Sequence, residues 1–168
     1  MFEYTPETEP VSALKETFRR HASGVSVITM TSKAGKPAGL TATSMTSLGA
    51  NPPLASFNVA SGSSSWPILC EAEFVAIHTL GQENVGLAKK MSSAHELRFV
   101  EDDWAFGPHN VPVFKSVTSV LIGRIREIHN VESNAVVIVD VLEGLVGREQ
   151  SGLLYYQRNY VSVGEIVS

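Results

Sequence analysis

The stretch GLTATSMTSLGANPPLASFNVASGSSSW, from Gly39 to Trp66, carries the clearest fold signal in the chain. Its first part is rich in small hydroxyl-bearing side chains, where a core strand would carry Val, Ile and Leu. The two prolines of Asn51-Pro52-Pro53 force a corner. Leu54 to Ala60 resumes as an apolar strand, and the stretch then ends in four serines.

Two interpretations of these small polar residues stay open on composition alone. Short side chains let a ligand approach the backbone, whose N–H groups and neighbouring hydroxyls can donate hydrogen bonds to a planar polar edge or a phosphate. The alternative is a solvated sheet face followed by a serine-rich loop. The sequence contains neither GxxxxGK[ST] nor GxGxxG after a strand, so strand edges and hydroxyls would have to hold any nucleotide-like ligand.

Strand-like segments follow one another along the chain with only short helices between them. This order disfavours a doubly wound parallel sheet and predicts a mainly β fold, a small antiparallel barrel with a few short flanking helices. We expect a flexible N-terminal arm over residues 1–11 and a single domain over 12–168. The expected helices are 13–21, 65–72 and 84–91, and the expected strands are 25–31, 40–48, 54–60, 74–80, 113–128, 135–146 and 153–163, the first two of them paired as a hairpin.

Composition excludes several classes of protein. The 168 residues carry a formal net charge of -4, and the thirteen Lys and Arg are scattered, so we expect no nucleic-acid partner. No apolar run approaches the roughly 20 residues of a membrane helix, and the acidic N-terminus does not resemble a signal peptide. A cytoplasmic location is therefore expected. Cys70, the single cysteine, is predicted to be a small core residue, and His78 a core histidine.

Several motifs together resemble the short flavin reductases, which have an FMN-binding split β-barrel and serve as reductase components of two-component monooxygenases. The block from Gly39 to Val59 resembles the flavin-binding strand pair of this family and its Pro-Pro corner. The resemblance spans about residues 12–160. It also includes the segments FRRHASGVSVITM, SSSWPIL, EFVAIHTLGQENVGLAKKM, LRFVEDDW, VPVF and LLYYQRNY.

The resemblance implies a flavin reductase that transfers hydride from NADH or NADPH to FMN, with FAD as an alternative flavin. It implies a homodimer with the flavin pocket across a two-fold interface, and an oxygenase component as a partner. The cofactor-binding residues that it implies are Thr41, Ala42, Thr43, Ser44, Ser47, Asn58, Ser61, Ser64 and Ser65, with Lys89 or Lys90 as a cation for the phosphate. For Ser64 and Ser65 the alternative is a helix cap, and for the lysines a solvated helix face.

One position departs from the family pattern. Many members carry a histidine near the flavin and nicotinamide, in the hairpin before a late strand, and Asn134 stands at that position here. Asparagine can donate and accept hydrogen bonds but cannot become cationic, so we expect Asn134 to position the nicotinamide, if His129 does not. The departure motivates a second hypothesis, a non-catalytic flavin-binding protein or one reduced by a protein donor. The histidines show no zinc spacing, and no metal site is expected.

Overall fold

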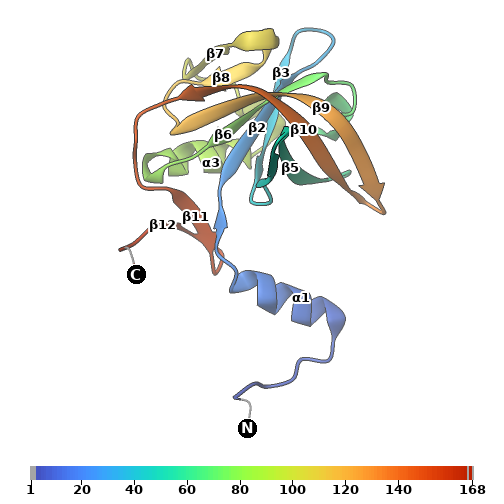
Figure 1. Cartoon of the computed structure of the whole chain (residues 1–168), viewed down its shortest axis with the longest axis vertical. Coiled ribbons are helices and arrows are strands. Elements are labelled where there is room, and N and C mark those ends of the chain that lie inside the picture. Colours follow the sequence, from blue (N-terminus) through green and yellow to red (C-terminus); the bar gives the residue numbers. More distant parts are fainter. Residues whose placement is uncertain (1–2, 166, 168) are drawn as a thin grey trace.

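Seven strands form one antiparallel sheet, the largest sheet of the computed structural model (Figure 1). The structure describes residues 3–165 and 167. The order across the sheet is β3-β2-β6-β9-β10-β5-β4. The strand bounds are β2 Ser26–Thr31, β3 Pro37–Ala42, β4 Thr46–Ala50, β5 Pro53–Ala60, β6 Phe74–Thr79, β9 Ser119–Val131 and β10 Asn134–Val146.

Smaller elements flank this sheet. One three-stranded sheet has the order β1-β11-β12, and a two-stranded ribbon joins β7 to β8. All named strand pairs in the described residues are antiparallel, which confirms the mainly β fold. The remaining bounds are α1 Pro10–Arg19, β1 Ser23–Gly24, α2 Trp66–Leu69, η1 Gln82–Asn84, α3 Val85–Met91, η2 His95–Leu97, β7 Trp104–Phe106, η3 Pro108–Asn110, β8 Pro112–Phe114, β11 Leu153–Tyr156 and β12 Asn159–Ser162.

The large sheet curls on itself because its two edge strands follow each other in the sequence. Only the connector formed by residues 43–45 links the end of β3 to the start of β4, and a link of this length spans at most about 14 Å. The sequence predicted one strand over 40–48. Its first part pairs with β2, from Ser26 opposite Ala42, but its last part pairs with β5 instead. The connector therefore closes the sheet.

Apolar side chains from strands across the large sheet fill its interior. Ile28 on β2, Leu40 on β3, Phe57 on β5 and Val137 on β10 belong to one buried cluster. Side chains alternate between the two faces of a strand, so the polar residues between these positions face outward. Thr41 and Asn58 are thereby placed on the outer surface by the same alternation that builds the core.

A second buried cluster includes Val27, Phe114 and Ile122. His78 is fully buried and contacts the Phe114 ring, which confirms the expected core histidine. Its Nδ1–H donates to Val27 O at 3.0 Å, and its Nε2 accepts the Phe114 N–H at 3.1 Å. Acceptance at Nε2 requires the neutral ring. Burial lowers the pKa of His78 to about 4, outweighing the hydrogen bond to the Val27 carbonyl. One neutral side chain thus ties β6 to β2 and β8.

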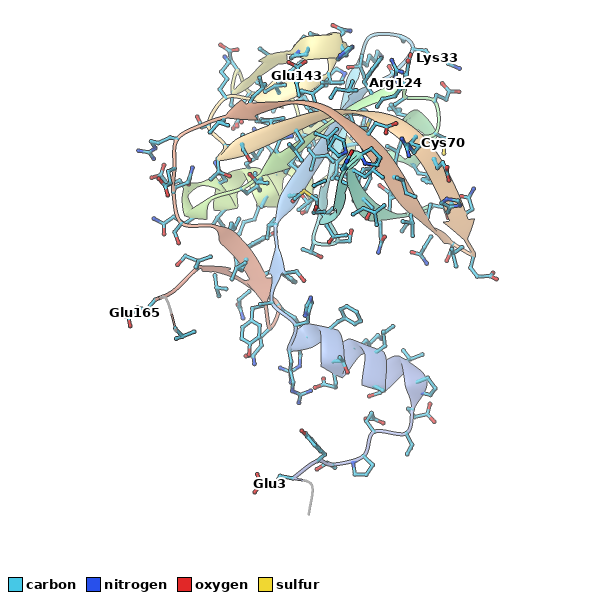
Figure 2. The ribbon with its side chains drawn as sticks, in the orientation of Figure 1. Glu3, Lys33, Cys70, Arg124, Glu143 and Glu165 are labelled. Atoms are coloured by element: carbon cyan, nitrogen blue, oxygen red, sulfur yellow. The ribbon has the colours of Figure 1, made fainter. Side chains whose placement is uncertain are left out.

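The prediction for Cys70 was wrong. Cys70 is exposed at the end of α2 (Figure 2), because α2 is only one turn long and buries Leu69 instead.

The first helix also differs from its expected bounds. It begins at Pro10, which needs no N–H partner in a first helical turn, and it ends at Arg19.

Candidate functional site

The connector of residues 43–45 is held in place by one serine. The Ser44 hydroxyl accepts the Asn58 N–H at 2.8 Å and donates to the Asn58 carbonyl at 3.3 Å. Thr43 is exposed beside it. Within residues 3–165, the backbone N–H groups of residues 43–45 donate to no other backbone carbonyl. The connector therefore carries backbone N–H groups without a backbone partner, next to the exposed Thr43 side chain.

The outer face of β3 adds a second group of polar side chains. The Thr41 hydroxyl donates to Ala88 O at 3.0 Å and so joins β3 to α3. Lys89 follows on α3, is exposed, and forms no ion pair with the part of the chain that is described. Lys90 forms ion pairs within the chain, because its Nζ lies 2.5 Å from an Asp103 carboxylate oxygen and 2.7 Å from one of Glu101. Of the two lysines, only Lys89 is available to a ligand.

The serine-rich turn after β5 contains three different environments. The Ser61 hydroxyl donates to Ser133 O at 3.0 Å, at the tip of the β9–β10 hairpin. Ser64 is exposed. Ser65 is fully buried, and its hydroxyl donates to Gly39 O at 2.7 Å. Ser65 thus fixes the turn to β3 and does not offer its hydroxyl to solvent, and its side chain forms no cap on α2.

Asn134 lies beside this turn. It is exposed at the start of β10, directly opposite Ala60 at the end of β5. His129 shares the row of Val136 and Asn58 across β9, β10 and β5. Residues in direct register point to the same face, so His129 and Asn58 lie on one surface, about 10 Å apart across two strand spacings. The His129 Nε2 is 2.7 Å from a carboxylate oxygen of Glu127.

Two of the expected residues face elsewhere. Ala42 is buried in the core, so only its backbone can face a ligand. Ser47 is exposed on β4 and lines a hollow of about 220 Å³, whose apolar lining includes Met45 of the connector, Leu54 and Leu121. Hydrogen bonds and strand register place Thr41, Ser44, Asn58, Ser61 and Asn134 along the outer side of the sheet from α3 to β10, with Ser65 buried at Gly39. Thr43, Ser64 and Lys89 are exposed and adjoin these positions in the sequence.

This surface is suited to binding a polar, anionic ligand. It provides hydroxyls, free N–H groups, two amides and one ammonium group. Within the described residues, no group of three or more His, Cys, Asp or Glu side chains is placed to hold a metal ion. In the same residues no helix is long and apolar enough to cross a membrane.

Arg98 is a buried residue that local sequence patterns did not indicate. The pattern LRFVEDDW contains it, but an arginine between Leu97 and Phe99 in an irregular segment carries no local sign of burial. Arg98 is only 8% exposed and donates to Gly39 O at 2.7 Å. The burial of Arg98 depends on contacts between residues far apart in the sequence, which local patterns do not show.

Comparison with known proteins gives a consistent result. Residues 18–164 match the model of the flavin reductase like domain. An NADH:FMN oxidoreductase of Rhodococcus qingshengii is 33% identical, over 93% of this chain and 90% of its own length. The crystal structure of a flavin reductase domain protein from Arthrobacter sp. FB24 superimposes with a TM-score of 0.90 at 42% identity, covering 94% and 98% of the two chains. The 4-hydroxyphenylacetate 3-monooxygenase reductase component of Salmonella typhi is 27% identical over 83% of this chain and 84% of its own.

Proposed function

Because the chain belongs to the flavin reductase like domain family, we propose that it transfers hydride from a reduced nicotinamide to flavin. The family match over residues 18–164 carries this conclusion. We further propose FMN as the flavin and NADH as the donor, the pair named for the Rhodococcus relative. The Salmonella relative is a reductase component, which supports a partner oxygenase that consumes the reduced flavin.

The site residues fit a flavin. The ring of a flavin has a polar edge that accepts and donates hydrogen bonds, and FMN also carries a phosphate. The free N–H groups of residues 43–45 and the Thr43 hydroxyl supply donors for the ring edge. The Asn58 amide and the Ser64 hydroxyl supply donors for the ribityl chain and phosphate, and Lys89 supplies a positive charge. The Ser61 hydroxyl, which donates to Ser133 O, can only accept a hydrogen bond from the ligand.

In this proposal the protein binds the flavin and orients the nicotinamide toward it. Hydride acceptance from a reduced nicotinamide is the chemistry that the flavin supplies when bound. The N–H donors of the connector stabilise negative charge at the ring edge, because they are fixed in advance by the Ser44–Asn58 hydrogen bonds. Asn134 and the row containing His129 border the surface where the nicotinamide would be positioned. Hydride transfer needs this positioning rather than a protein acid or base.

The proposed function is tested by steady-state oxidation of NADH and NADPH with FMN, FAD or no flavin. The proposal predicts flavin-dependent oxidation that is fastest with NADH and FMN. A rate with flavin and protein no higher than with flavin alone would overturn the proposed activity. A preference for NADPH or FAD would overturn only the assignment of donor or flavin.

The connector provides the first testable site. Changing Thr43→Val together with Ser44→Val is expected to weaken FMN binding by about tenfold or more, because a ring-edge donor is lost and the clamp on Asn58 is released. Quenching of flavin fluorescence on titration measures the affinity. Thr17→Val on α1 is the matched control, since Thr17 is exposed on an element outside the site. Unchanged affinity in the double variant would remove the connector from the site.

We also propose a homodimer, which helix α1 supports. This helix lies away from the barrel (Figure 1) and buries none of its residues. Val11, Leu14 and Phe18 are 63%, 60% and 61% exposed at helical spacing, and Phe18 has an edge contact with the His21 ring. This apolar stripe is therefore largely uncovered within the described chain. A second copy of the chain is the occupant that we propose for it.

The dimer proposal predicts that Leu14→Asp with Phe18→Asp gives a monomer, because burying two carboxylates in an apolar interface is strongly unfavourable. Light scattering after size exclusion gives the mass of the parent and of each variant. Thr17→Asp on the same helix is the control and is expected to remain dimeric. A parent that elutes as a monomer, or a double variant that stays dimeric, would contradict the proposal.

A further inference from the structure

Arg98 is a buried cation whose partners are all neutral. Its Nη1 donates to Gly39 O at 2.7 Å and to the Ser65 hydroxyl at 3.1 Å. Its Nε and Nη2 donate to Ser93 O at 3.1 and 2.8 Å. Among the residues described, no carboxylate forms an ion pair with it.

These bonds join three segments that are far apart in the sequence. Gly39 lies on β3, two residues before Thr41, and Ser65 ends the serine-rich turn. Ser65 also donates to Gly39 O at 2.7 Å, so the arginine and the serine share one carbonyl. Arg98 therefore holds the turn that presents Ser64 against the strand that presents Thr41.

No carboxylate of the described residues lies within ion-pair distance of Arg98, although Glu96 is near enough to attract its charge. Buried charges in proteins are usually paired, because carbonyl dipoles replace only part of the lost hydration. Burial lowers the pKa of Arg98, but an arginine stays protonated throughout the neutral range. Arg98 contacts Ser65, the neighbour of exposed Ser64, so its fixed positive charge favours an anion at that turn, and burial shields this attraction from salt.

We propose that Arg98 is a positioning residue for the phosphate of the flavin: it fixes the serine-rich turn to β3 and selects flavins that carry a phosphate. The inference rests on the proposed flavin site and adds a basis for choosing among flavins. FMN and riboflavin share the ring and ribityl chain and differ in the phosphate. The ratio of their affinities therefore measures selection for the phosphate, separately from any general loosening of the site.

The experiment compares FMN and riboflavin binding by fluorescence titration in the parent, Arg98→Gln and Arg98→Lys. Gln keeps hydrogen-bond donors and removes the charge, whereas Lys keeps the charge. In Arg98→Gln we expect FMN affinity to fall about tenfold, with riboflavin affinity within about threefold of the parent. Arg98→Lys is expected to keep the FMN preference within about threefold. Arg148→Gln, which removes an exposed charge paired with Glu83, is expected to change neither affinity.

Three outcomes would overturn the inference. One is a parent that binds both flavins equally, and another is a parallel loss of both in Arg98→Gln. The third applies if thermal denaturation shows that Arg98→Gln does not fold. Arg98→Lys is then the test, and a tenfold fall in its preference for FMN over riboflavin would overturn the inference. A parent that binds neither flavin would overturn the proposed function itself, whereas an unaltered ratio in a folded Arg98→Gln variant would overturn only the role of Arg98.

Discussion

Acidification from pH 7 to pH 4 is expected to remove about 3 kcal/mol of unfolding free energy through His78 alone. The folded-state pKa of His78 is about 4, against an ordinary value of 6.5. Between pH 6.5 and pH 4, His78 is protonated in the unfolded chain but stays neutral in the folded protein. The free energy of unfolding therefore falls as the pH drops toward 4. Each pH unit across this window costs about 1.4 kcal/mol. Above pH 6.5, His78 is neutral in both states, and its pH-dependent contribution to the free energy of unfolding is fully present.

Urea unfolding at several pH values tests this expectation when the parent is compared with His78→Gln. The glutamine removes the titrating group, so the variant should lose about 3 kcal/mol less than the parent between pH 7 and pH 4. His21→Gln serves as the control, because His21 is exposed and its ring has an edge contact with exposed Phe18. Parallel stability curves for the parent and His78→Gln would show that His78 does not carry the acid sensitivity.

Gly39→Ala is expected to cost about 3 kcal/mol, at the upper end of the range for overpacking. A Cβ at this position would lie 2.6 Å from the Met91 Cε and 2.8 Å from the Ile28 carbonyl oxygen. The methionine tip can move, but the carbonyl belongs to the neighbouring strand and cannot retreat without shifting β2. Because β3 also carries Thr41 and leads to Thr43, the same change should weaken flavin binding.

The matched control for this substitution is Gly86→Ala on α3. A Cβ there meets nothing within 4 Å, and alanine is favoured over glycine inside a helix by up to about 1 kcal/mol. Chemical denaturation of the two variants should therefore give changes of opposite sign. Equal stability of Gly39→Ala and the parent would mean that β3 has room at this position.

Local patterns were sufficient to predict most of the strands but not how the sheet closes. The hairpin of β2 and β3 and the strand β6 could be predicted, because alternation and turn residues are local signals. The break after Ala42 could not, since the small residues continue through it without a turn signal. Only the pairing of β4 with β5 reveals it.

The same limit applies to the site. Residue type and the family resemblance indicated hydroxyl-rich segments, and the structure places most of them on one surface. They did not distinguish Ser64, which is exposed, from Ser65, which is buried under Gly39 and Arg98. Nor did they distinguish Lys89 from Lys90, whose ion pairs come from a segment more than ten residues away. These differences arise from tertiary contacts that adjacent residues do not share.

Anaerobic reduction of FMN by NADH in the presence of the purified protein tests the central claim most directly. The visible absorption of the oxidised flavin is followed after mixing, with a second sample receiving NADPH and a third lacking protein. The proposed function predicts rapid bleaching that depends on the protein, faster with NADH than with NADPH. Flavin that binds to the protein but stays oxidised with both donors would contradict it.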